Sequence, residues 1–162
     1  MSDLFNQAQP EILVSVKRPL ADLMRPTSFD FVVGQERLLG PNTTLSLMIS
    51  RGSLSSFILW GPPGVGKTTI ARLLSTSFEI HFEQLSAIFS GVKELRNIFD
   101  SAKIRKKNGK STLLFVDEIH RFNKSQQDAF LPYIEDGTVV LVGTTTENPS
   151  FSLNSALLSR CQ

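Results

Sequence analysis

The sequence predicts an α/β protein of three layers, in which a parallel β-sheet carries helices on both faces. Short apolar runs alternate with amphipathic stretches, which is the pattern of strands joined by crossover helices. The 162 residues, 41% of them apolar, suffice for one compact domain but not for two. Strands are expected at Phe57–Trp60, Ile80–Leu85, Thr112–Val116 and Val139–Val142. Helices are expected at Leu38–Ser50, Gly66–Phe78, Gly91–Lys107, Lys124–Glu135 and Leu153–Leu158.

The first residues differ in character from the rest. Residues 1–18 are polar and show no sustained period, which predicts a flexible N-terminal tail with one short extended piece over 12–16. The domain itself is expected to span residues 19–162. The tail has no basic stretch followed by an apolar one, and no apolar run in the sequence is long enough to cross a bilayer. We therefore expect a cytoplasmic protein that makes no membrane contact.

The domain is expected to open with a helix and an apolar loop. Leu20, Leu23 and Met24 lie on one helical face, and an apolar loop follows over 29–33. We expect both to feed side chains into the core. The next helix is closed by Gly52, because glycine is favoured just beyond a helix end.

Charge and cysteine content restrict the partners of the chain. The formal net charge is +2, with 17 basic and 15 acidic residues interspersed, so nothing attracts the whole chain to nucleic acid or to an anionic membrane. Any DNA contact must therefore be local, and the basic run Lys103–Lys110 is interpreted as a solvated helix end. Cys161 is the only cysteine, which excludes an internal disulfide, and no Cys/His cluster has zinc-ligand spacing.

A glycine-rich motif joins the first expected strand to the helix after it. It matches G-x-x-x-x-G-K-[ST] with one more threonine, and its residues are Gly61, Pro62, Pro63, Gly64, Val65, Gly66, Lys67, Thr68 and Thr69. The amides of residues 64–69 can close around a β-phosphate at the helix N-terminus, whereas the two prolines offer no amide hydrogen. Lys67 would place its charge between the β- and γ-phosphates, and the Thr68 hydroxyl would ligate Mg²⁺. The motif therefore predicts MgATP binding.

The third expected strand ends in two carboxylates. Asp117 and Glu118 follow an apolar run at the carboxyl end of the strand, where parallel sheets bind ligands. Asp117 is expected to hold Mg²⁺ or one of its waters, and Glu118 to orient and polarise a water for in-line attack on the γ-phosphorus. A charge pair at a helix N-terminus is the alternative interpretation. The phosphate motif upstream favours the catalytic one.

Polar residues also follow the fourth expected strand. Thr144, Thr145 and Thr146 lead into Glu147 and Asn148, which places hydroxyl and amide groups where a γ-phosphate sensor would lie. Threonines also suit strand ends, and Thr-Glu-Asn-Pro is typical of a turn. The composition alone favours the turn and leaves both interpretations open.

Three stretches carry a resemblance to a known family. They are the phosphate motif, the segment Phe115–Asp128 and the segment Gly143–Arg160. These stretches resemble the replication-associated recombination protein A family, the AAA+ group that includes the Werner helicase-interacting proteins and is similar to clamp-loader subunits. The first motif is shared by all P-loop ATPases, whereas the other two are long and specific to the family. The resemblance implies the AAA+ form of the P-loop NTPase fold.

The resemblance also implies roles for individual residues. By likeness, Thr146 is the sensor 1 residue, and Arg160 is an arginine finger that reaches the ATP of a neighbouring subunit, which requires a head-to-tail homo-oligomer. The family segment that lines the adenine pocket is similar to the part of this sequence that contains Arg25, Pro26, Val32 and Val33. The residues that would contact DNA phosphates without reading sequence are Ser90, Gly91, Lys93 and Arg96. Helix capping is an equally good interpretation of Ser90.

The implied activity is a DNA-dependent ATPase that acts in replication-fork maintenance, recombination and repair. Its implied partners are ATP, Mg²⁺, DNA at forks, gaps or ends, and single-stranded-DNA-binding protein or other replisome components near the nucleoid. A non-hydrolysing switch subunit of a clamp-loader-like assembly is the alternative, and a small-molecule kinase is a third hypothesis. A Glu118→Gln change separates the first two, because only an enzyme loses turnover through it.

The sequence departs from the family pattern after Arg160. Family members continue into a fifth core strand and a helical lid, and the sequence ends at Gln162 before both. AAA+ cores order their strands 5-1-4-3-2, so the strand Phe57–Trp60 is expected to be a bare apolar edge that promotes pairing between chains. We also expect adenine burial and ATP hydrolysis to be weakened in this shortened core.

Overall fold

The fold is built on a parallel sheet of four strands. The computed structural model describes residues 18–162, so the tail and the extended piece expected over 12–16 lie outside the described residues. The strands are β1 (Phe57–Trp60), β2 (His81–Ser86), β3 (Thr112–Asp117) and β4 (Val139–Thr145), in the order β1-β4-β3-β2. All neighbouring pairs are parallel. The α/β class and the strand positions are confirmed, although β4 runs three residues beyond its predicted end.

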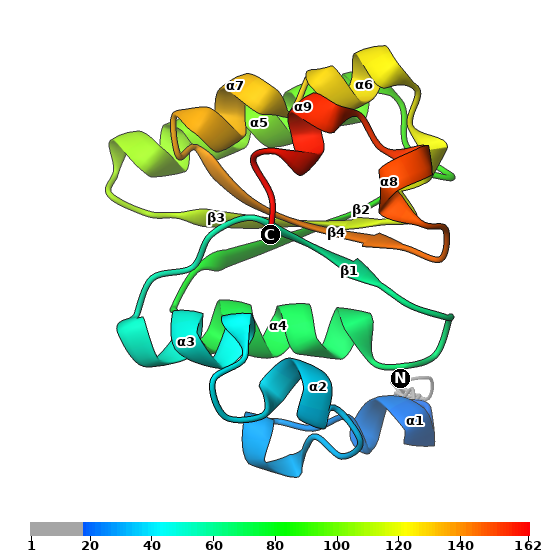
Figure 1. Ribbon diagram of the computed structural model, residues 1–162. Helices are drawn as coiled ribbons and strands as arrows, with labels where there is room; N and C mark the ends of the chain where they lie inside the picture. Colours follow the sequence, from blue (N-terminus) through cyan, green and yellow to red (C-terminus); the bar gives the residue numbers. More distant parts are fainter. Residues whose placement is uncertain (1–17) are drawn as a thin grey trace, which may run out of the picture.

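Helices cover both faces of this sheet (Figure 1). In chain order the helical elements are α1 (Leu20–Leu23), η1 (Phe29–Phe31), α2 (Glu36–Leu39), α3 (Thr44–Arg51), α4 (Lys67–Ser77), α5 (Val92–Lys107), η2 (Ile119–Arg121), α6 (Lys124–Asp128), α7 (Leu131–Glu135), α8 (Pro149–Ser152) and α9 (Ser155–Leu158). The layer with α3 and α4 lies on one face, and the layer with α5, α6, α7 and α9 lies on the other. The three-layer architecture expected from the sequence is therefore present.

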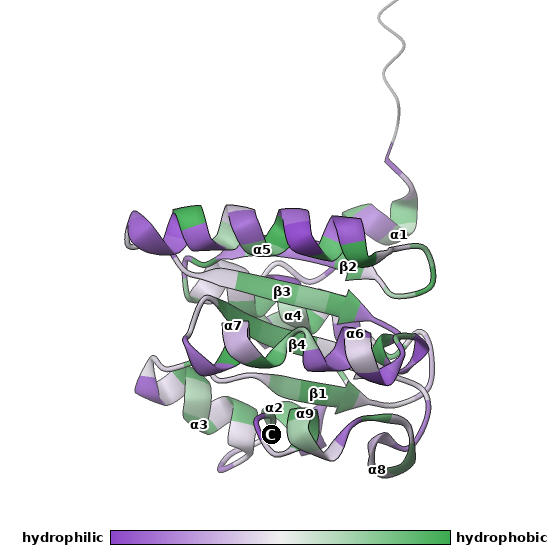
Figure 2. Ribbon diagram, turned by 90° about the horizontal axis from the view of Figure 1, so that it is seen from above, coloured by the Kyte–Doolittle hydropathy of each residue, from purple (hydrophilic) through white to green (hydrophobic). Residues whose placement is uncertain are grey.

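The core consists of two apolar clusters, one on each face of the sheet. Strand β3 contributes to both, because successive side chains of a strand point to opposite faces. Leu113 and Phe115 belong to the cluster under α3 and α4, and Leu114 and Val116 to the cluster under α5 and α7. All four are fully buried, as expected of a central parallel strand. Figure 2 shows the apolar strands between helices with polar outer surfaces.

The helix expected over Leu38–Ser50 is wrong as a single element. It is divided into α2 and α3 by a turn that contains Pro41, which has no amide hydrogen to continue a helix. Thr43 then begins α3, since its side chain accepts a hydrogen bond of 3.3 Å from Ser46 N. The predicted end is right, because Gly52 adopts the left-handed conformation with φ of 64°.

Two later helices are also divided. The helix expected over Lys124–Glu135 is α6 followed by α7, with Pro132 in the first turn of α7. The helix expected over Leu153–Leu158 is shorter, and a separate helix α8 precedes it. Asn148 begins α8 by accepting a hydrogen bond of 3.0 Å from Ser150 N. By contrast, α4 and α5 agree with their predicted bounds to within one residue at each end.

The first helix contributes less to the core than expected. Leu20, Leu23 and Met24 are 64–74% exposed. Of the apolar loop, Phe29 packs against the core, whereas Phe31 is 67% exposed. The expectation that this segment feeds the core is therefore wrong apart from Phe29.

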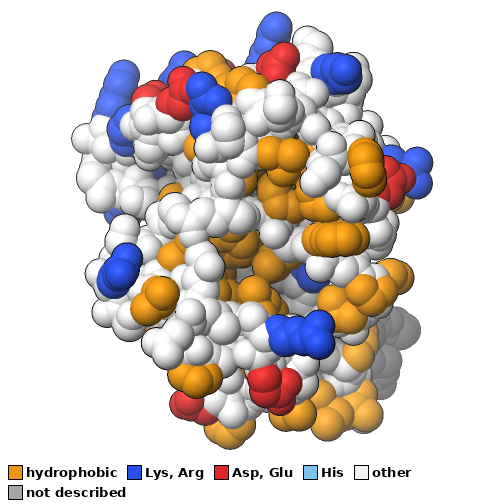
Figure 3. Space-filling view, in the orientation of Figure 1, with side chains coloured by type: hydrophobic (Ala, Val, Ile, Leu, Met, Phe, Trp, Pro, Cys, Tyr) orange, Lys and Arg blue, Asp and Glu red, His pale blue; other side chains and the backbone are white. Residues whose placement is uncertain are grey.

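Strand β1 lies at the edge of the sheet, as the expected strand order requires. The edge is not entirely bare. Ile58 N donates to Gln162 O at 2.9 Å, and Gln162 N donates to Ser56 O at 3.0 Å, which is the pairing of a parallel strand. Figure 3 views this side, where apolar side chains show in the hollow between the helix layers. The residues that line a pocket along β1 are Leu38, Thr44, Leu45, Met48, Phe57, Ile58, Leu59 and Gln162.

Candidate functional site

The phosphate motif forms the loop between β1 and α4. Gly64 and Gly66 have φ of 79° and 92°, a region that residues with a side chain rarely adopt. Gly66 is the residue before α4, and within residues 18–162 no side chain caps this helix end. The amides of its first turn are therefore directed to whatever lies in the loop, which is the arrangement that holds phosphate.

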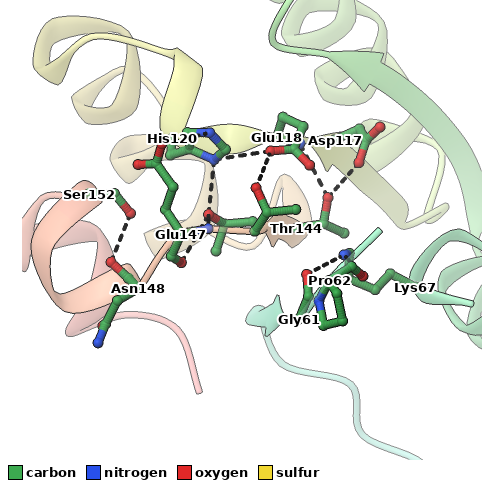
Figure 4. A network of polar contacts seen from close by, with 12 residues as sticks. Gly61, Pro62, Lys67, Asp117, Glu118, His120, Thr144, Glu147, Asn148 and Ser152 are labelled. Carbon is green, nitrogen blue, oxygen red and sulfur yellow. Dashed lines mark hydrogen bonds and ion pairs between the residues drawn. The ribbon is translucent and has the colours of Figure 1, made fainter. Parts of the chain in front are cut away.

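Lys67 lies across this loop. Its ammonium donates to Gly61 O at 2.8 Å and to Pro62 O at 2.9 Å (Figure 4). These carbonyls hold the cation over the loop, and the oxygens of a bound phosphate would compete for the same hydrogens. The lysine is therefore placed for the phosphate contact expected of it.

Asp117 and Glu118 are fixed by Thr144, which the sequence places among the polar residues after the fourth strand without a role of its own. The hydroxyl of Thr144, fully buried at the end of β4, donates to Asp117 Oδ1 at 2.6 Å. The Thr144 hydroxyl oxygen in turn accepts a hydrogen bond of 3.2 Å from Glu118 N. One side chain thus holds both acidic residues from the neighbouring strand. Pairing of β3 with β4 is what brings them together. The family resemblance implies this strand order, but nothing local in the sequence shows which side chains then meet.

Glu118 adopts the left-handed conformation with φ of 54°, which is uncommon for a residue with a long side chain. Its carboxylate accepts a hydrogen bond of 3.2 Å from the Thr146 hydroxyl. The candidate water-orienting residue and the candidate sensor are therefore in direct contact. This backbone conformation marks the point where the chain leaves β3 for η2.

The loop and the acidic residues share one end of the sheet. Trp60 pairs with Thr145, and Gly61 N then donates to Thr145 O at 3.1 Å. The next strand along carries Asp117. The Thr68 hydroxyl and the Asp117 carboxylate are hard oxygen ligands of the type that Mg²⁺ prefers, with phosphate oxygens completing such a site. Within residues 18–162 there is no cluster of three or more His, Cys, Asp or Glu side chains suited to a metal. The Thr68 and Asp117 oxygens fit Mg²⁺ carried by a nucleotide.

His120 is a residue of the site to which the sequence assigns no role. Its side chain is only 4% exposed and lies between two carboxylates. Nδ1 is 3.3 Å from Glu118 Oε2 and 2.9 Å from Thr145 Oγ1, while Nε2 is 3.5 Å from Glu147 Oε1. A lone histidine three residues after Asp117 was the only sequence signal of this arrangement.

A groove beside the phosphate loop is the candidate base-binding region. It is lined by Gln35, Arg37, Leu38, Ile58, Leu59, Trp60, Val65, Lys67 and Ile70. Gln35 Nε2 donates to Val65 O at 2.7 Å, which attaches the N-terminal segment to the loop.

None of the four residues expected at the adenine is in that lining. Arg25 forms an exposed ion pair of 3.5 Å with Asp22, and Val33 is 89% exposed. Pro26 and Val32 are half-buried. The assignment of these residues to the adenine stays a prediction.

Arg160 lies outside this site. It forms an ion pair with Glu135 of α7, and its Nη1 donates to Ala156 O and to Ser159 Oγ, each at 3.0 Å. Its side chain is 39% exposed. None of these partners belongs to the phosphate loop, and the role of Arg160 as a finger for a neighbouring subunit stays a prediction.

The candidate DNA residues lie where β2 passes into α5. Gly91, Lys93 and Arg96 are exposed, and Ser90 is half-buried. Helix α5 begins after Gly91 without a side-chain cap, so the interpretation of Ser90 as a capping residue is wrong. The contact with DNA stays a prediction.

Comparison with known proteins settles the family. Residues 57–162 match the ATPase family associated with various cellular activities (AAA). The chain belongs to this family. Within residues 18–162, no helix of this AAA chain is long and apolar enough to cross a membrane.

Curated relatives agree with the resemblance stated from the motifs. Replication-associated recombination protein A of Haemophilus influenzae is 54% identical over 144 residues, which are 89% of this AAA chain and 32% of that protein. The protein of the same name from Escherichia coli K12 is 54% identical over 145 residues, which are 90% of this chain and 32% of that protein. ATPase WRNIP1 of Dictyostelium discoideum is 49% identical over 144 residues, with shares of 89% and 16%. The chain thus spans about a third of the length of these bacterial relatives.

Solved structures confirm the fold. RuvB of Thermotoga maritima, described as a Holliday junction branch migration motor, superposes with a TM-score of 0.65 at 31% identity. The match covers 85% of the AAA chain and 46% of RuvB. The AAA domain of FIGL-1 in complex with ADP gives a TM-score of 0.54 at 25% identity, over 70% of this chain and 42% of that one.

Proposed function

We propose that this AAA chain is the ATP-binding and ATP-hydrolysing core of a DNA-dependent ATPase that acts in replication-fork maintenance, recombination and repair. One observation carries the ATPase half of the proposal. The phosphate loop, Asp117 and the Glu118–Thr146 pair lie at one end of the sheet and are tied together by hydrogen bonds from β4. The names of the homologous proteins support the DNA half.

The mechanism follows from the roles these side chains can take. The first-turn amides of α4 and the Lys67 ammonium bind the β- and γ-phosphates. Bound Mg²⁺, held by Thr68 and Asp117, supplies Lewis-acid neutralisation of the phosphate oxygens. Glu118 orients a water in line with the γ-phosphorus and draws its proton as the P–O bond to the leaving ADP breaks. Thr146 holds the Glu118 carboxylate in that orientation through its hydroxyl.

Arg160 completes the proposed site from a neighbouring subunit. Its present partners lie on α7 and α9, and a guanidinium in that position can transfer its hydrogen bonds to a γ-phosphate presented by another copy. The proposal therefore includes a head-to-tail oligomer, since one copy supplies the loop and the next supplies the finger.

Hydrolysis is favoured over a non-hydrolysing switch by the contact between Thr146 and Glu118. A switch has to bind ATP but has no need of a carboxylate held at the end of β3 to orient water.

The DNA contacts proposed for Lys93 and Arg96 would be to phosphates. Removal of either side chain would therefore lower the affinity for DNA of every sequence alike.

The test is phosphate release from MgATP as a function of protein concentration, with and without forked or gapped DNA. Glu118→Gln is the blank. We expect release to rise faster than linearly with protein, because each site needs a neighbour. Phosphate release that never exceeds the blank would overturn hydrolysis by this chain.

A mixing experiment isolates the finger. Lys67→Met blocks nucleotide binding but keeps the finger, and Arg160→Ala does the reverse. We expect each variant alone to be inactive and their equal mixture to regain activity, because an Arg160 from one copy can serve the loop of the other. An inactive mixture alongside an active wild type would refute action in trans.

A further inference from the structure

His120 joins two carboxylates that belong to different parts of the chain. Glu118 follows the last residue of β3, whereas Glu147 lies in the turn between β4 and α8 (Figure 4). The imidazole presents Nδ1 to the first at 3.3 Å and Nε2 to the second at 3.5 Å. Because the ring is 4% exposed, water cannot readily replace either contact. The ring is therefore a connection between the two carboxylates.

The Glu147 end of this connection is open to the surroundings. The Glu147 side chain is 57% exposed, and Phe151 of the adjoining α8 is 89% exposed. Thr145 strengthens the turn, since its hydroxyl contacts His120 Nδ1 at 2.9 Å and accepts a hydrogen bond of 3.0 Å from Glu147 N. A change at this exposed turn would therefore reach the buried ring directly.

We propose that His120 is a positioning residue that couples the orientation of the Glu118 carboxylate to the turn at Glu147. This inference rests on the proposed ATPase function. His120 Nδ1 lies 3.3 Å from Glu118 Oε2, the oxygen that also accepts from the Thr146 hydroxyl, so the buried ring limits the positions that this carboxylate can take. Displacement of Glu147 moves the ring and alters how Glu118 faces the γ-phosphate.

Substitutions of His120 can remove its contacts with Glu118 and Glu147 separately. His120→Asn keeps a donor near the position of Nδ1 and loses the reach to Glu147. His120→Gln keeps a donor near the position of Nε2 and loses the contact with Glu118. His120→Ala removes both. His81, the other histidine of the chain, pairs with Glu83 on β2, and His81→Ala is the matched control.

The primary measurement is the ratio of the dissociation constants for a slowly hydrolysed ATP analogue and for ADP, each with Mg²⁺. The fluorescence of Trp60, the only tryptophan and a lining residue of the groove, reports binding. We expect His120→Ala to weaken the analogue about fivefold and to leave ADP unchanged, because only the γ-phosphate meets Glu118. We expect His120→Asn, which loses only the reach to Glu147, to give the same ratio as Glu147→Gln. We expect His120→Gln to behave like the Ala variant and His81→Ala to behave like the wild type.

Coupling to the turn is tested by a double-mutant cycle. Glu147→Gln should change the same ratio in the wild type and have no further effect in His120→Ala or in Glu118→Gln, since the path is then already broken. In turnover, His120→Ala should lower kcat and raise KM for ATP about as much as it weakens the analogue, whereas His81→Ala should change neither. Equal losses of analogue and ADP affinity, or additive effects in the cycle, would show a purely structural role and overturn the proposal.

A nucleotide-free measurement separates this inference from the proposed function. Nitrogen-15 NMR of the two imidazole rings should show the His120 signals shifting with both Glu118→Gln and Glu147→Gln, while the His81 signals stay in place. A chain that binds neither nucleotide would refute the proposed function alone. His120 signals that ignore either substitution would refute the connection, whatever the nucleotide results.

Discussion

Thr144 and Asp117 are joined across neighbouring strands by a hydrogen bond of 2.6 Å between the threonine hydroxyl and Oδ1 of the carboxylate. The same hydroxyl accepts from Glu118 N at 3.2 Å. Its single hydrogen is used by Asp117 and its lone pair by Glu118, so the two acidic residues are held through one atom. The position of Asp117, the proposed metal ligand, therefore depends on β4 as much as on its own strand.

Thr144→Val tests the contribution of this hydroxyl, because it removes the hydroxyl and keeps nearly the same side-chain shape. Valine fills nearly the same space, but leaves Glu118 N and Asp117 Oδ1 without a partner. We expect a loss of about 1–3 kcal/mol in unfolding free energy and weaker Mg²⁺-dependent nucleotide binding. Urea unfolding and Trp60 fluorescence measure the two effects. Thr144→Ser, which keeps the hydroxyl, should retain most of both, and equal losses in Ser and Val would contradict this account.

Lys67→Met should abolish most nucleotide affinity while changing stability little. The ammonium contacts two carbonyls of an exposed loop, so its loss costs little in the folded protein. A charge-assisted contact to phosphate is worth about 1.5–3 kcal/mol, which predicts MgATP binding about 10- to 100-fold weaker. Titration followed by Trp60 fluorescence is the measurement. Lys110→Met, an exposed lysine just before β3, is the control and should bind like the wild type.

Gly143→Ala should destabilise the sheet, because Ile58 of β1 and Ile119 of η2 leave no room for a side chain at Gly143. A Cβ at this position would lie 2.8 Å from Ile58 Cδ1, and 3.1 Å and 3.2 Å from two carbons of Ile119. Such overpacking costs about 1–3 kcal/mol, which urea unfolding would measure. Ile58→Val removes the closest carbon, so the double variant should lose less than the sum of the two single changes. Strictly additive losses would show that the clash lies elsewhere.

Local chemistry explains why part of this fold could be predicted from the sequence. The phosphate loop has its own glycines, a preceding apolar strand and a following amphipathic helix, so its position and conformation are encoded within about twenty residues. Asp117 and Glu118 were likewise placed by the end of a buried strand. These predictions depended on neighbours in sequence, and the structure has β1, α4 and β3 where they were expected.

Contacts between strands explain what the sequence could not predict. The roles of Thr144 and His120 arise only when β4 is laid beside β3, a pairing with no local signal.

The divided helices have another cause. Pro41 and Pro132 each stand within a helical spacing of apolar residues that continues past them. The spacing predicts one helix, whereas the structure has two on either side of a break near each proline. Gln162 covers part of β1 through backbone bonds alone, which side-chain patterns do not reveal.

Cys161 should make stability sensitive to alkaline pH. Burial raises the pKa of its thiol from the ordinary 9.0 to about 11, because a thiolate is poorly solvated there. The folded state thus favours the neutral thiol, and its contribution to stability is complete below pH 9 and lost as the pH rises through about 11. We expect the wild type to lose about 2 kcal/mol more than Cys161→Ala between pH 8 and pH 10.5, in urea unfolding at each pH. Comparing the two proteins cancels the titration of lysines and tyrosine, which both contain. A difference between them that stays constant over this range would mean that the thiol is solvated, and that the segment pairing with β1 at Gln162 is open in solution.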